Sequence, residues 1–206
     1  MWVIVEGLDG SGKTTAIEYI ARRAAELGKD VVMTKGIGSG EIGSFLRGKI
    51  LEDEYTDEKM NELAFPLALM DCARVSVNAL NLGKLVITDR FVASYYAYSK
   101  YKDADHPFRN KLVRNVEKYA QDLVNGEHTI VELFINTPIN TCIDRIRFRG
   151  VSNKLDNASR EEFLRINSNF KDYFSVSNAG REITNAGSLG GFYTQLNGFI
   201  DDVIDT

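Results

Sequence analysis

The sequence of 206 residues has little of what marks several protein classes. It has three prolines, no Pro- or Ser-rich linker and no internal repeat. Its two cysteines, Cys72 and Cys142, are too few for a disulfide framework, and their apolar, helix-like surroundings predict buried free thiols. No stretch approaches the roughly 18 apolar residues of a membrane span, and the start, MWVIVEGLDG, does not resemble a signal peptide. We therefore expect a cytoplasmic protein that does not associate with membranes.

The charge balance excludes a further class. Lys and Arg number 25 against 29 Asp and Glu, so the net charge is −4. A mildly acidic chain does not carry a broad nucleic-acid footprint, so nucleic acid is not an expected partner. The apolar share of 44% and the charged share of 26% are those of a globular protein. The length predicts one domain over residues 1–206.

Short apolar runs alternate with longer amphipathic stretches along the chain. The runs of strand length are Trp2–Glu6, Asp30–Thr34, Lys84–Thr88, Thr129–Asn136 and Arg181–Thr184. The stretches of helix length are Lys13–Leu27, Glu41–Leu51, Asp57–Leu82, Pro107–Val124, Ile139–Arg149, Ser159–Asn178 and Leu189–Ile204. Predicted N-caps are Asp57 and Ser159, and predicted helix stops are Gly28, Gly83, Gly126 and Gly150. This alternation predicts an α/β fold with an open parallel sheet.

The segment from Gly7 to Thr14 matches the phosphate-loop pattern G-x-x-x-x-G-K-[ST]. It follows an apolar strand and opens a helix, which lets backbone N–H groups and the helix N-terminus face phosphate oxygens. Lys13 is expected to reach the β- and γ-phosphates of ATP, and the Thr14 hydroxyl to bind Mg²⁺. The predicted ATP-binding residues are Gly7, Leu8, Asp9, Gly10, Ser11, Gly12, Lys13, Thr14 and Thr15.

Two other segments imitate nucleotide-binding motifs. Gly43 to Lys49 repeats most of the phosphate-loop pattern, but Ile50 replaces the hydroxyl residue and no strand precedes it, which favours an amphipathic helix. Asn153 to Asp156 spells the guanine-reading motif N-K-x-D of GTPases. A basic, helix-like segment precedes that motif instead of a buried strand, so we do not interpret it as a guanine site.

A second apolar strand ends in an acid and a base, Asp89 and Arg90. The carboxyl ends of parallel strands line the ligand crevice of such sheets. Asp89 is therefore a candidate for the Mg²⁺ shell, and Arg90 is a candidate clamp for a phosphate.

Four segments together resemble the thymidylate kinase family of P-loop nucleoside monophosphate kinases. They are Glu6–Thr15, Ser39–Leu46, Asp89–Ser99, which is similar to D-R-[YH]-x-x-S-x-x-A-[YF], and Asn136–Gly150. The resemblance implies a three-layer fold whose five-stranded parallel sheet carries helices on both faces. It also implies transfer of the ATP γ-phosphoryl group to a deoxynucleoside 5′-monophosphate, and a possible homodimer through long helices.

The resemblance assigns roles to further residues. Asp9 is expected to contact the acceptor sugar hydroxyl, and Arg90 to hold the acceptor phosphate. A lid is expected at about residues 145–158. Gly10 stands where some relatives have a basic residue, so the lid arginines, with Arg147 and Arg149 as the catalytic candidates beside Arg145, are expected to act on the transferred phosphate.

The sequence departs from the family around the acceptor. The family sandwiches the acceptor base with a Phe four residues before an Arg; here Arg74 is present, but Met70 replaces the Phe. An Arg74 donor fork would favour bases with a carbonyl at O4, which indicates dTMP or a 5-substituted dUMP as acceptor. Tyr95 occupies a position facing the base where relatives often have a small or polar residue, and Tyr98 matches the aromatic residue over the sugar.

The family arginine of the second-strand loop is also missing. That loop offers only Lys35, with Arg47 further along the chain. Two alternatives stay open at this point. One is a kinase that acts on a hydroxymethyl pyrimidine within DNA, and the other is a nucleotide-binding switch or ATPase without an acceptor pocket.

Overall fold

The computed structural model describes residues 1–51, 58–99, 107–150, 158–177 and 180–205. Five parallel strands form one sheet in the order β2-β3-β1-β4-β5. The strands are β1 (Trp2–Glu6), β2 (Val31–Lys35), β3 (Leu85–Asp89), β4 (Ile130–Asn136) and β5 (Gly180–Thr184). The central position of β1 places the loop that follows it next to the carboxyl end of β3, as the register Val5 to Asp89 shows.

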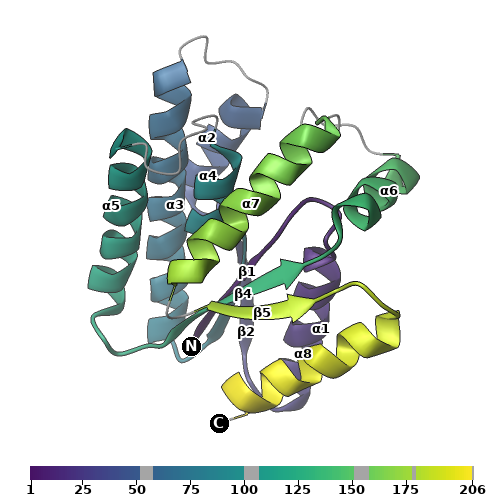
Figure 1. Cartoon of the computed structure of the whole chain (residues 1–206). Helices are drawn as coiled ribbons and strands as arrows, with labels where there is room; N and C mark the ends of the chain where they lie inside the picture. The colour runs from purple at the N-terminus through teal and green to yellow at the C-terminus, as the bar shows by residue number, and fades with distance from the viewer. Residues whose placement is uncertain (52–57, 100–106, 151–157, 178–179, 206) are drawn as a thin grey trace.

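The described helices cover both faces of this sheet (Figure 1). They are α1 (Lys13–Glu26), α2 (Glu41–Leu51), α3 (Glu58–Asn81), α4 (Val92–Tyr98), α5 (Pro107–Val124), α6 (Ile139–Arg149), α7 (Arg160–Val176) and α8 (Leu189–Val203). The arrangement confirms the predicted three-layer α/β fold with a five-stranded parallel sheet.

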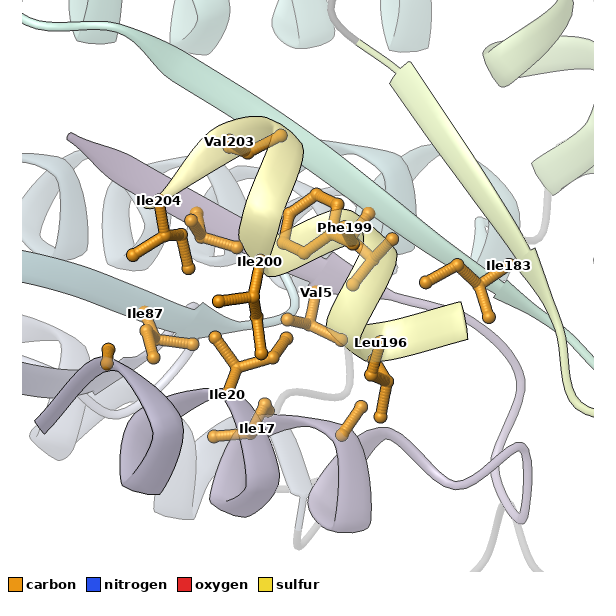
Figure 2. Close-up of a cluster of buried hydrophobic side chains, with 14 of the residues drawn as sticks. Val5, Ile17, Ile20, Ile87, Ile183, Leu196, Phe199, Ile200, Val203 and Ile204 are labelled. Carbon is orange, nitrogen blue, oxygen red and sulfur yellow. The ribbon is translucent and has the colours of Figure 1, made fainter. Parts of the chain in front are cut away.

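The residues of β1 alternate between two cores, because successive strand side chains point to opposite faces. Val3 and Val5 face α1 and α8, where Ile20, Phe199 and other apolar side chains meet them (Figure 2). Trp2 and Ile4 face the other core, which α3, α4 and α5 cover. Every residue of β1 is buried, so the phosphate loop leaves a strand that is packed on both sides.

A third apolar cluster packs α4, α6 and α7 together beside the carboxyl end of β4. Phe134 of β4 and Phe170 of α7 lie at its centre with ring centroids 5.5 Å apart. Leu8 of the phosphate loop and Cys142 of α6 are buried in the same cluster. This packing fixes α6, the start of the predicted lid, against the phosphate loop.

Most predicted elements are present within one or two residues of their expected bounds. Ser159 caps α7 as predicted, since its hydroxyl accepts from Glu162 N at 3.2 Å, whereas Asp57 lies outside the described residues. The four predicted helix-stop glycines all have left-handed φ angles between 68° and 77°. Both cysteines are free and buried, as predicted. Helix α4 was not predicted.

One part of α3 qualifies the expectation about membrane spans. Within the described residues, the stretch Glu62–Asn81 is long and apolar enough to cross a membrane by length and composition alone. In the structure 56% of its most apolar window is buried inside the protein. A helix packed against a sheet needs the same apolar composition, so the stretch is accounted for as a core helix.

The carboxylate of Glu132 on β4 lies buried beneath α7. Its oxygens accept hydrogen bonds from the hydroxyls of Tyr173, at 3.2 Å, and Ser177, at 3.1 Å. Burial and the negative charge of Glu6 raise the pKa of Glu132 from 4.5 to about 7, although those two hydroxyls act in the opposite direction. The folded state therefore binds more protons than the unfolded state between these two values, and its stability falls as the pH rises through that range.

Replacement of Glu132 by Gln is expected to remove this loss of stability. At pH 8 the variant should exceed the original protein in free energy of unfolding by no more than about 3 kcal/mol, with little difference at about pH 4, where both side chains are neutral. Thermal unfolding followed from pH 4 to 8 measures the effect, with the exposed Glu127→Gln as the control. A variant that loses stability at pH 8 would show that the Glu132 charge is favourable in the fold.

Candidate active site

A cavity of about 580 Å³ opens at the carboxyl ends of β1, β2 and β3. Five segments of the chain line it. The lining residues are Asp9, Gly10, Gly12, Lys13, Thr14 and Thr15; Lys35, Gly36, Ile37 and Arg47; Phe65 and Leu69; Asp89, Arg90, Phe91, Ser94, Tyr95 and Tyr98; and Arg145, Ile146 and Arg149. The phosphate loop and the end of β3 thus face one shared space, as the two motifs predict. Its volume lies in the range of small-molecule sites.

The phosphate loop is held in place by α6 and by the residues that follow β4 and β5. A Cβ added to Gly10 would lie 2.4 Å from the Cys142 carbonyl oxygen of α6, and Gly10 has a φ of 77°. The carbonyl oxygen of Ser11 accepts hydrogen bonds from Thr137 Oγ1 at 2.9 Å and from Asn185 Nδ2 at 2.8 Å. These residues come from the ends of β4 and β5, so the sheet itself fixes the loop's shape before any ligand binds. Only glycine fits at Gly10.

Lys13 is the buried cation of this loop, with 7% of its surface exposed. Its Nζ donates to the carbonyl oxygens of Gly7, at 3.1 Å, and Leu8, at 2.8 Å. Burial and the Arg90 charge lower the pKa of Lys13 to about 8, although Asp9 and other acids act in the opposite direction. An ammonium held at a phosphate loop with so little water around it has a strong electrostatic interaction with a nucleotide phosphate.

Asp9, Arg90 and Tyr98 form a linked polar group close to Lys13, since Arg90 Nη1 and Lys13 Nζ both donate to the Gly7 carbonyl oxygen, at 3.0 and 3.1 Å. Arg90 Nη2 donates to Asp9 Oδ1 at 2.6 Å, and the Tyr98 hydroxyl donates to Asp9 Oδ2 at 3.0 Å. The Arg90 guanidinium also lies over the Tyr98 ring, 5.0 Å from its centroid. Burial disfavours the charged form of Asp9, but the Arg90 and Lys13 charges outweigh it and lower the pKa of this carboxyl. The group offers a cationic fork beside a charged carboxylate.

Asp89 and Thr14 are the two predicted magnesium ligands, and both line the cavity. Asp89 Oδ1 is buried and has no hydrogen-bond partner among the described residues. Those residues contain no cluster of three or more His, Cys, Asp or Glu side chains that could enclose a metal ion. Mg²⁺ in nucleotide enzymes usually has one or two protein oxygens and takes its other ligands from phosphates and water. The unpartnered carboxylate oxygen and the Thr14 hydroxyl fit that requirement.

Of the lid arginines, Arg145 lies closest to the phosphate loop. Its Nη1 donates to the carbonyl oxygens of Gly10, at 3.3 Å, and Ser11, at 3.4 Å. Arg149 also lines the cavity, whereas Arg147 is exposed and is not among the lining residues. Residues 151–157 of the predicted lid, with the N-K-x-D segment, lie outside the described residues.

The aromatic side of the cavity differs from the predicted base pocket. Phe65 and Leu69 of α3 line the cavity together with Tyr95 of α4, and the rings of Phe65 and Tyr95 have centroids 6.0 Å apart. The Tyr95 hydroxyl donates to the Glu62 carbonyl oxygen at 3.3 Å, which holds the ring in place.

Met70 and Arg74 are not among the residues that line the cavity. Met70 packs against the core cluster between α3 and the sheet. The Arg74 side chain is 51% exposed and donates to Asp71 Oδ1 from Nε, at 3.1 Å, and from Nη2, at 2.7 Å. Asp71 in turn accepts from Gly43 N at 3.0 Å, so this ion pair ties α3 to α2. The structure therefore does not bring these two predicted residues to the other site residues.

Two cations stand near the position of the missing family arginine. Arg47 of α2 lines the cavity, and its Nη1 donates to the Ile37 carbonyl oxygen at 2.7 Å. A Cβ added to Gly38 would lie 3.0 Å from Arg47 Cδ, so the glycine leaves room for the arginine side chain. Lys35 at the end of β2 lines the cavity as well. The segment Gly43–Lys49 is helical, as predicted, since it lies within α2.

Sequence reasoning missed Phe65, Leu69, Thr137 and Asn185, and it left Arg145 and Arg47 outside the predicted site. Phe65 and Leu69 are four residues apart on one helix and could have been recognised as a shared face. Asn185 and Thr137 each follow a predicted strand, and polar residues at strand ends were the only signal for them.

Comparison with known proteins gives one consistent family. The family model described as thymidylate kinase matches residues 5–187. A thymidylate kinase of Campylobacter concisus is 29% identical over 171 residues, which cover 83% of each chain. One from Exiguobacterium sibiricum is 35% identical over 150 residues, or 70% of this chain and 68% of the relative. A probable thymidylate kinase of Pyrococcus horikoshii is 28% identical over 161 residues, which cover 75% of this chain and 74% of that protein.

Proposed function

The chain belongs to the thymidylate kinase family, and from that premise we propose that it transfers the γ-phosphoryl group of ATP to dTMP or a 5-substituted dUMP. The observation that carries the proposal is one cavity that brings together the phosphate loop and a second cation, Arg90, which follows β3 and is not part of the loop. A switch or an ATPase needs the phosphate loop only. The Asp9–Arg90–Tyr98 group is accounted for by a second phosphate-bearing substrate.

Phosphoryl transfer depends on positioning the two substrates and on neutralising phosphate charge rather than on acid–base chemistry. An oxygen of the acceptor phosphate attacks the γ-phosphorus, the bond from that phosphorus to the β-bridging oxygen breaks, and ADP leaves. Lys13 neutralises the charge on the donor phosphates once it moves from the Gly7 and Leu8 carbonyls. Arg90 holds the acceptor phosphate, and Asp9 accepts a hydrogen bond from the acceptor sugar hydroxyl. Thr14 and Asp89 would hold Mg²⁺, which would supply further neutralisation of phosphate charge.

Arg145 is our candidate for the lid cation that reaches the transferred group. It already contacts the phosphate loop beside Gly10, where no basic side chain is present. Arg149 lines the cavity one helical turn further on, and Arg147 would need the lid to move. Developing charge in phosphoryl transfer is stabilised best by arginine close to the donor. We retain Arg147 and Arg149 as proposed catalytic residues and add Arg145 to them.

The acceptor base has an apolar wall in Phe65, Leu69 and Tyr95. Such a wall binds a base through stacking and contact with a 5-substituent, because it has few polar groups to read the base edge. Arg47 and Lys35 also line the cavity and are our candidates for a second contact to the acceptor phosphate. Because Arg74 lies outside the lining, we no longer assign base reading to it.

A coupled assay of ADP release tests the proposed function. The panel contains dTMP, dUMP, 5-hydroxymethyl-dUMP, dCMP, dAMP, dGMP and an oligonucleotide with a hydroxymethyl pyrimidine. ADP formed only with free monophosphates, and fastest with dTMP or a 5-substituted dUMP, would support the proposal. ADP formed only with the oligonucleotide would select the DNA kinase, and turnover without any acceptor would select the ATPase.

Replacement of Phe65 by Ala is expected to raise the KM for dTMP by about tenfold or more. Loss of base–aromatic stacking costs on the order of 1–3 kcal/mol, and the KM for ATP should hardly change because Phe65 lies on the acceptor side.

Arg74→Ala is the contrasting variant: if Arg74 reads the base, the preference for dTMP over dCMP falls in that variant. We expect the preference to persist, with a lower thermal stability as the ion pair to Asp71 is lost.

We also propose a cytoplasmic location and a homodimer. Two buried free thiols suit a reducing compartment. Helices α2 and α3 expose five large apolar side chains to solvent: Ile42, Phe45, Met60, Leu63 and Leu67. Exposed apolar patches of this kind are typical of subunit interfaces, and a second copy of the chain would cover this one.

A further inference from the structure

Glu6 is a fully buried carboxylate one residue before the phosphate loop, and it is not among the residues that line the cavity. Its Oε1 accepts hydrogen bonds from the backbone N–H groups of Phe91, at 2.6 Å, and Ser94, at 3.2 Å. Its Oε2 accepts from the Ser94 hydroxyl at 2.5 Å. Three donors on one side chain favour the charged form of Glu6, whereas burial raises the pKa of this carboxyl.

These contacts fix the start of α4. The helix begins after Phe91, whose own side chain makes no capping hydrogen bond. The cap is therefore Glu6 Oε1, which accepts from the backbone N–H groups of Phe91 and Ser94. The residue before Phe91 is Arg90, with a left-handed φ of 66°. That conformation is strained for a residue with a side chain, so the neighbouring contacts must hold it. Val5 O accepts from Arg90 N at 3.0 Å, so the last two residues of β1 hold both sides of the strained position.

Ser94 connects Glu6 to the Arg90 side chain. A serine hydroxyl has one proton, and here it is donated to Glu6 Oε2, which leaves the oxygen lone pairs to accept from Arg90 Nη1 at 2.9 Å. The same Nη1 donates to Gly7 O at 3.0 Å. Both acceptors direct one edge of the guanidinium toward the phosphate loop, while Nη2 reaches Asp9.

We propose that Glu6 is a positioning residue for the acceptor phosphate: it holds the strained Arg90 backbone and, through the Ser94 hydroxyl, sets the orientation of the Arg90 guanidinium. The inference rests on the proposed function for the identity of the ligand that Arg90 holds. Glu6 itself touches no substrate. We expect its effect mainly on the acceptor, because its hydrogen bonds go to Phe91 and Ser94 beside Arg90 and none of them goes to Lys13.

Glu6→Gln tests the role with little change in volume. The amide oxygen can still accept from Phe91 N, but the amide N–H₂ faces Ser94 Oγ, so the Ser94 proton loses its acceptor and the hydroxyl that accepts from Arg90 Nη1 must reorient. We expect the acceptor KM to rise by about tenfold or more, since small misplacements of a positioning group cost up to about 100-fold, and the ATP KM to stay within about twofold. Glu132→Gln is the matched control, because Glu132 is also buried, lies on the adjacent strand and accepts from two hydroxyls.

The comparison separates positioning from a general loss of packing. The inference is overturned if Glu6→Gln and Glu132→Gln change the acceptor KM equally, or if Glu6→Gln raises both substrate KM values together. Should Glu6→Gln fail to fold, Ser94→Ala replaces it and is expected to raise the acceptor KM in the same direction. An unchanged acceptor KM in Ser94→Ala would then overturn the inference.

A second measurement does not depend on turnover. The NMR signals of the Arg90 guanidinium N–H groups, assigned with Arg90→Lys, should be resolved in the original protein and averaged by rotation in Glu6→Gln, without any substrate present. If the original protein phosphorylates no acceptor, the proposed function fails while this signal still tests the positioning role. If the signal is the same in Glu6→Gln and the original protein, the positioning role fails while the proposed function stands.

Discussion

Replacement of Lys13 by alanine is expected to lower kcat by about 100-fold to 1,000-fold. Loss of one preorganised charge stabiliser from a site that excludes water costs roughly 2.7–4 kcal/mol of transition-state stabilisation. Lys13 fits that description because only 7% of its surface is exposed and it sits at the opening of α1. No other lysine of the cavity can replace it, since Lys35 lies at the end of β2 on the acceptor rim.

Steady-state rates with saturating ATP and dTMP measure this effect. Lys84→Ala is the matched control: it removes the same charge from the opposite, amino end of β3, where Lys84 pairs with Asp30 at 3.2 Å. We expect Lys84→Ala to keep the original turnover. If Lys13→Ala turned over within tenfold of the original protein, the phosphate loop assigned to Gly7–Thr14 would be wrong.

The donor side could be predicted from the sequence because it is local. Strand, loop and helix follow one another within residues 2–26. The residue types in each part favour the backbone conformation of that part. The glycines allow left-handed conformations, the apolar strand fixes the loop on the sheet, and Lys13 begins the helix. The sequence could not show that Thr137 and Asn185 hold the loop through the Ser11 carbonyl oxygen, because these residues follow strands far away in the chain.

Two of the predicted acceptor residues, Met70 and Arg74, do not line the cavity, and the reason is the rotation of α3. Successive helix residues are about 100° apart, so a pair at positions 65 and 69 and a pair at 70 and 74 form two stripes that are centred roughly 140° apart around the same helix. The amphipathic pattern does not separate these stripes, because α3 is apolar on more than one side and packs against both α2 and the sheet. Only the tertiary contacts, such as the Arg74–Asp71 pair, decide which stripe faces the cavity.

Helix α4 was missed for a related reason. The segment Val92–Tyr98 is short, and three of its seven residues are tyrosines, which have a lower intrinsic helix propensity than Ala or Leu. Its cap comes from Glu6, 85 residues earlier in the chain, and no local signal announces it. The same contact holds Arg90 in place. The cap of α4, which could not be predicted from the sequence, is therefore also part of the site's geometry.

Replacement of Arg90 by alanine is expected to raise the acceptor KM by about 100-fold or more while the ATP KM changes by less than about threefold. Hydrogen bonds from a charged donor to a phosphate are worth roughly twice those between neutral groups, and removal of the buried fork also leaves Asp9 without its main partner. Of the two cations that lower the pKa of Asp9, only Lys13 would then remain. The main consequence acts on the acceptor, because on the donor side Arg90 makes one hydrogen bond, to Gly7 O, besides lowering the pKa of Lys13.

Arg90→Lys distinguishes the fork from the charge. A lysine keeps the positive charge but cannot bond Asp9, Ser94 and a phosphate oxygen in one plane, so we expect it to recover only part of the affinity lost in Arg90→Ala. Initial-rate kinetics with each substrate varied, together with ATP binding measured by titration calorimetry, give both constants. An equal loss of ATP affinity in Arg90→Ala would mean that Arg90 holds a donor phosphate. The cavity's two sides would then have to be exchanged, because the second cation group would no longer require an acceptor.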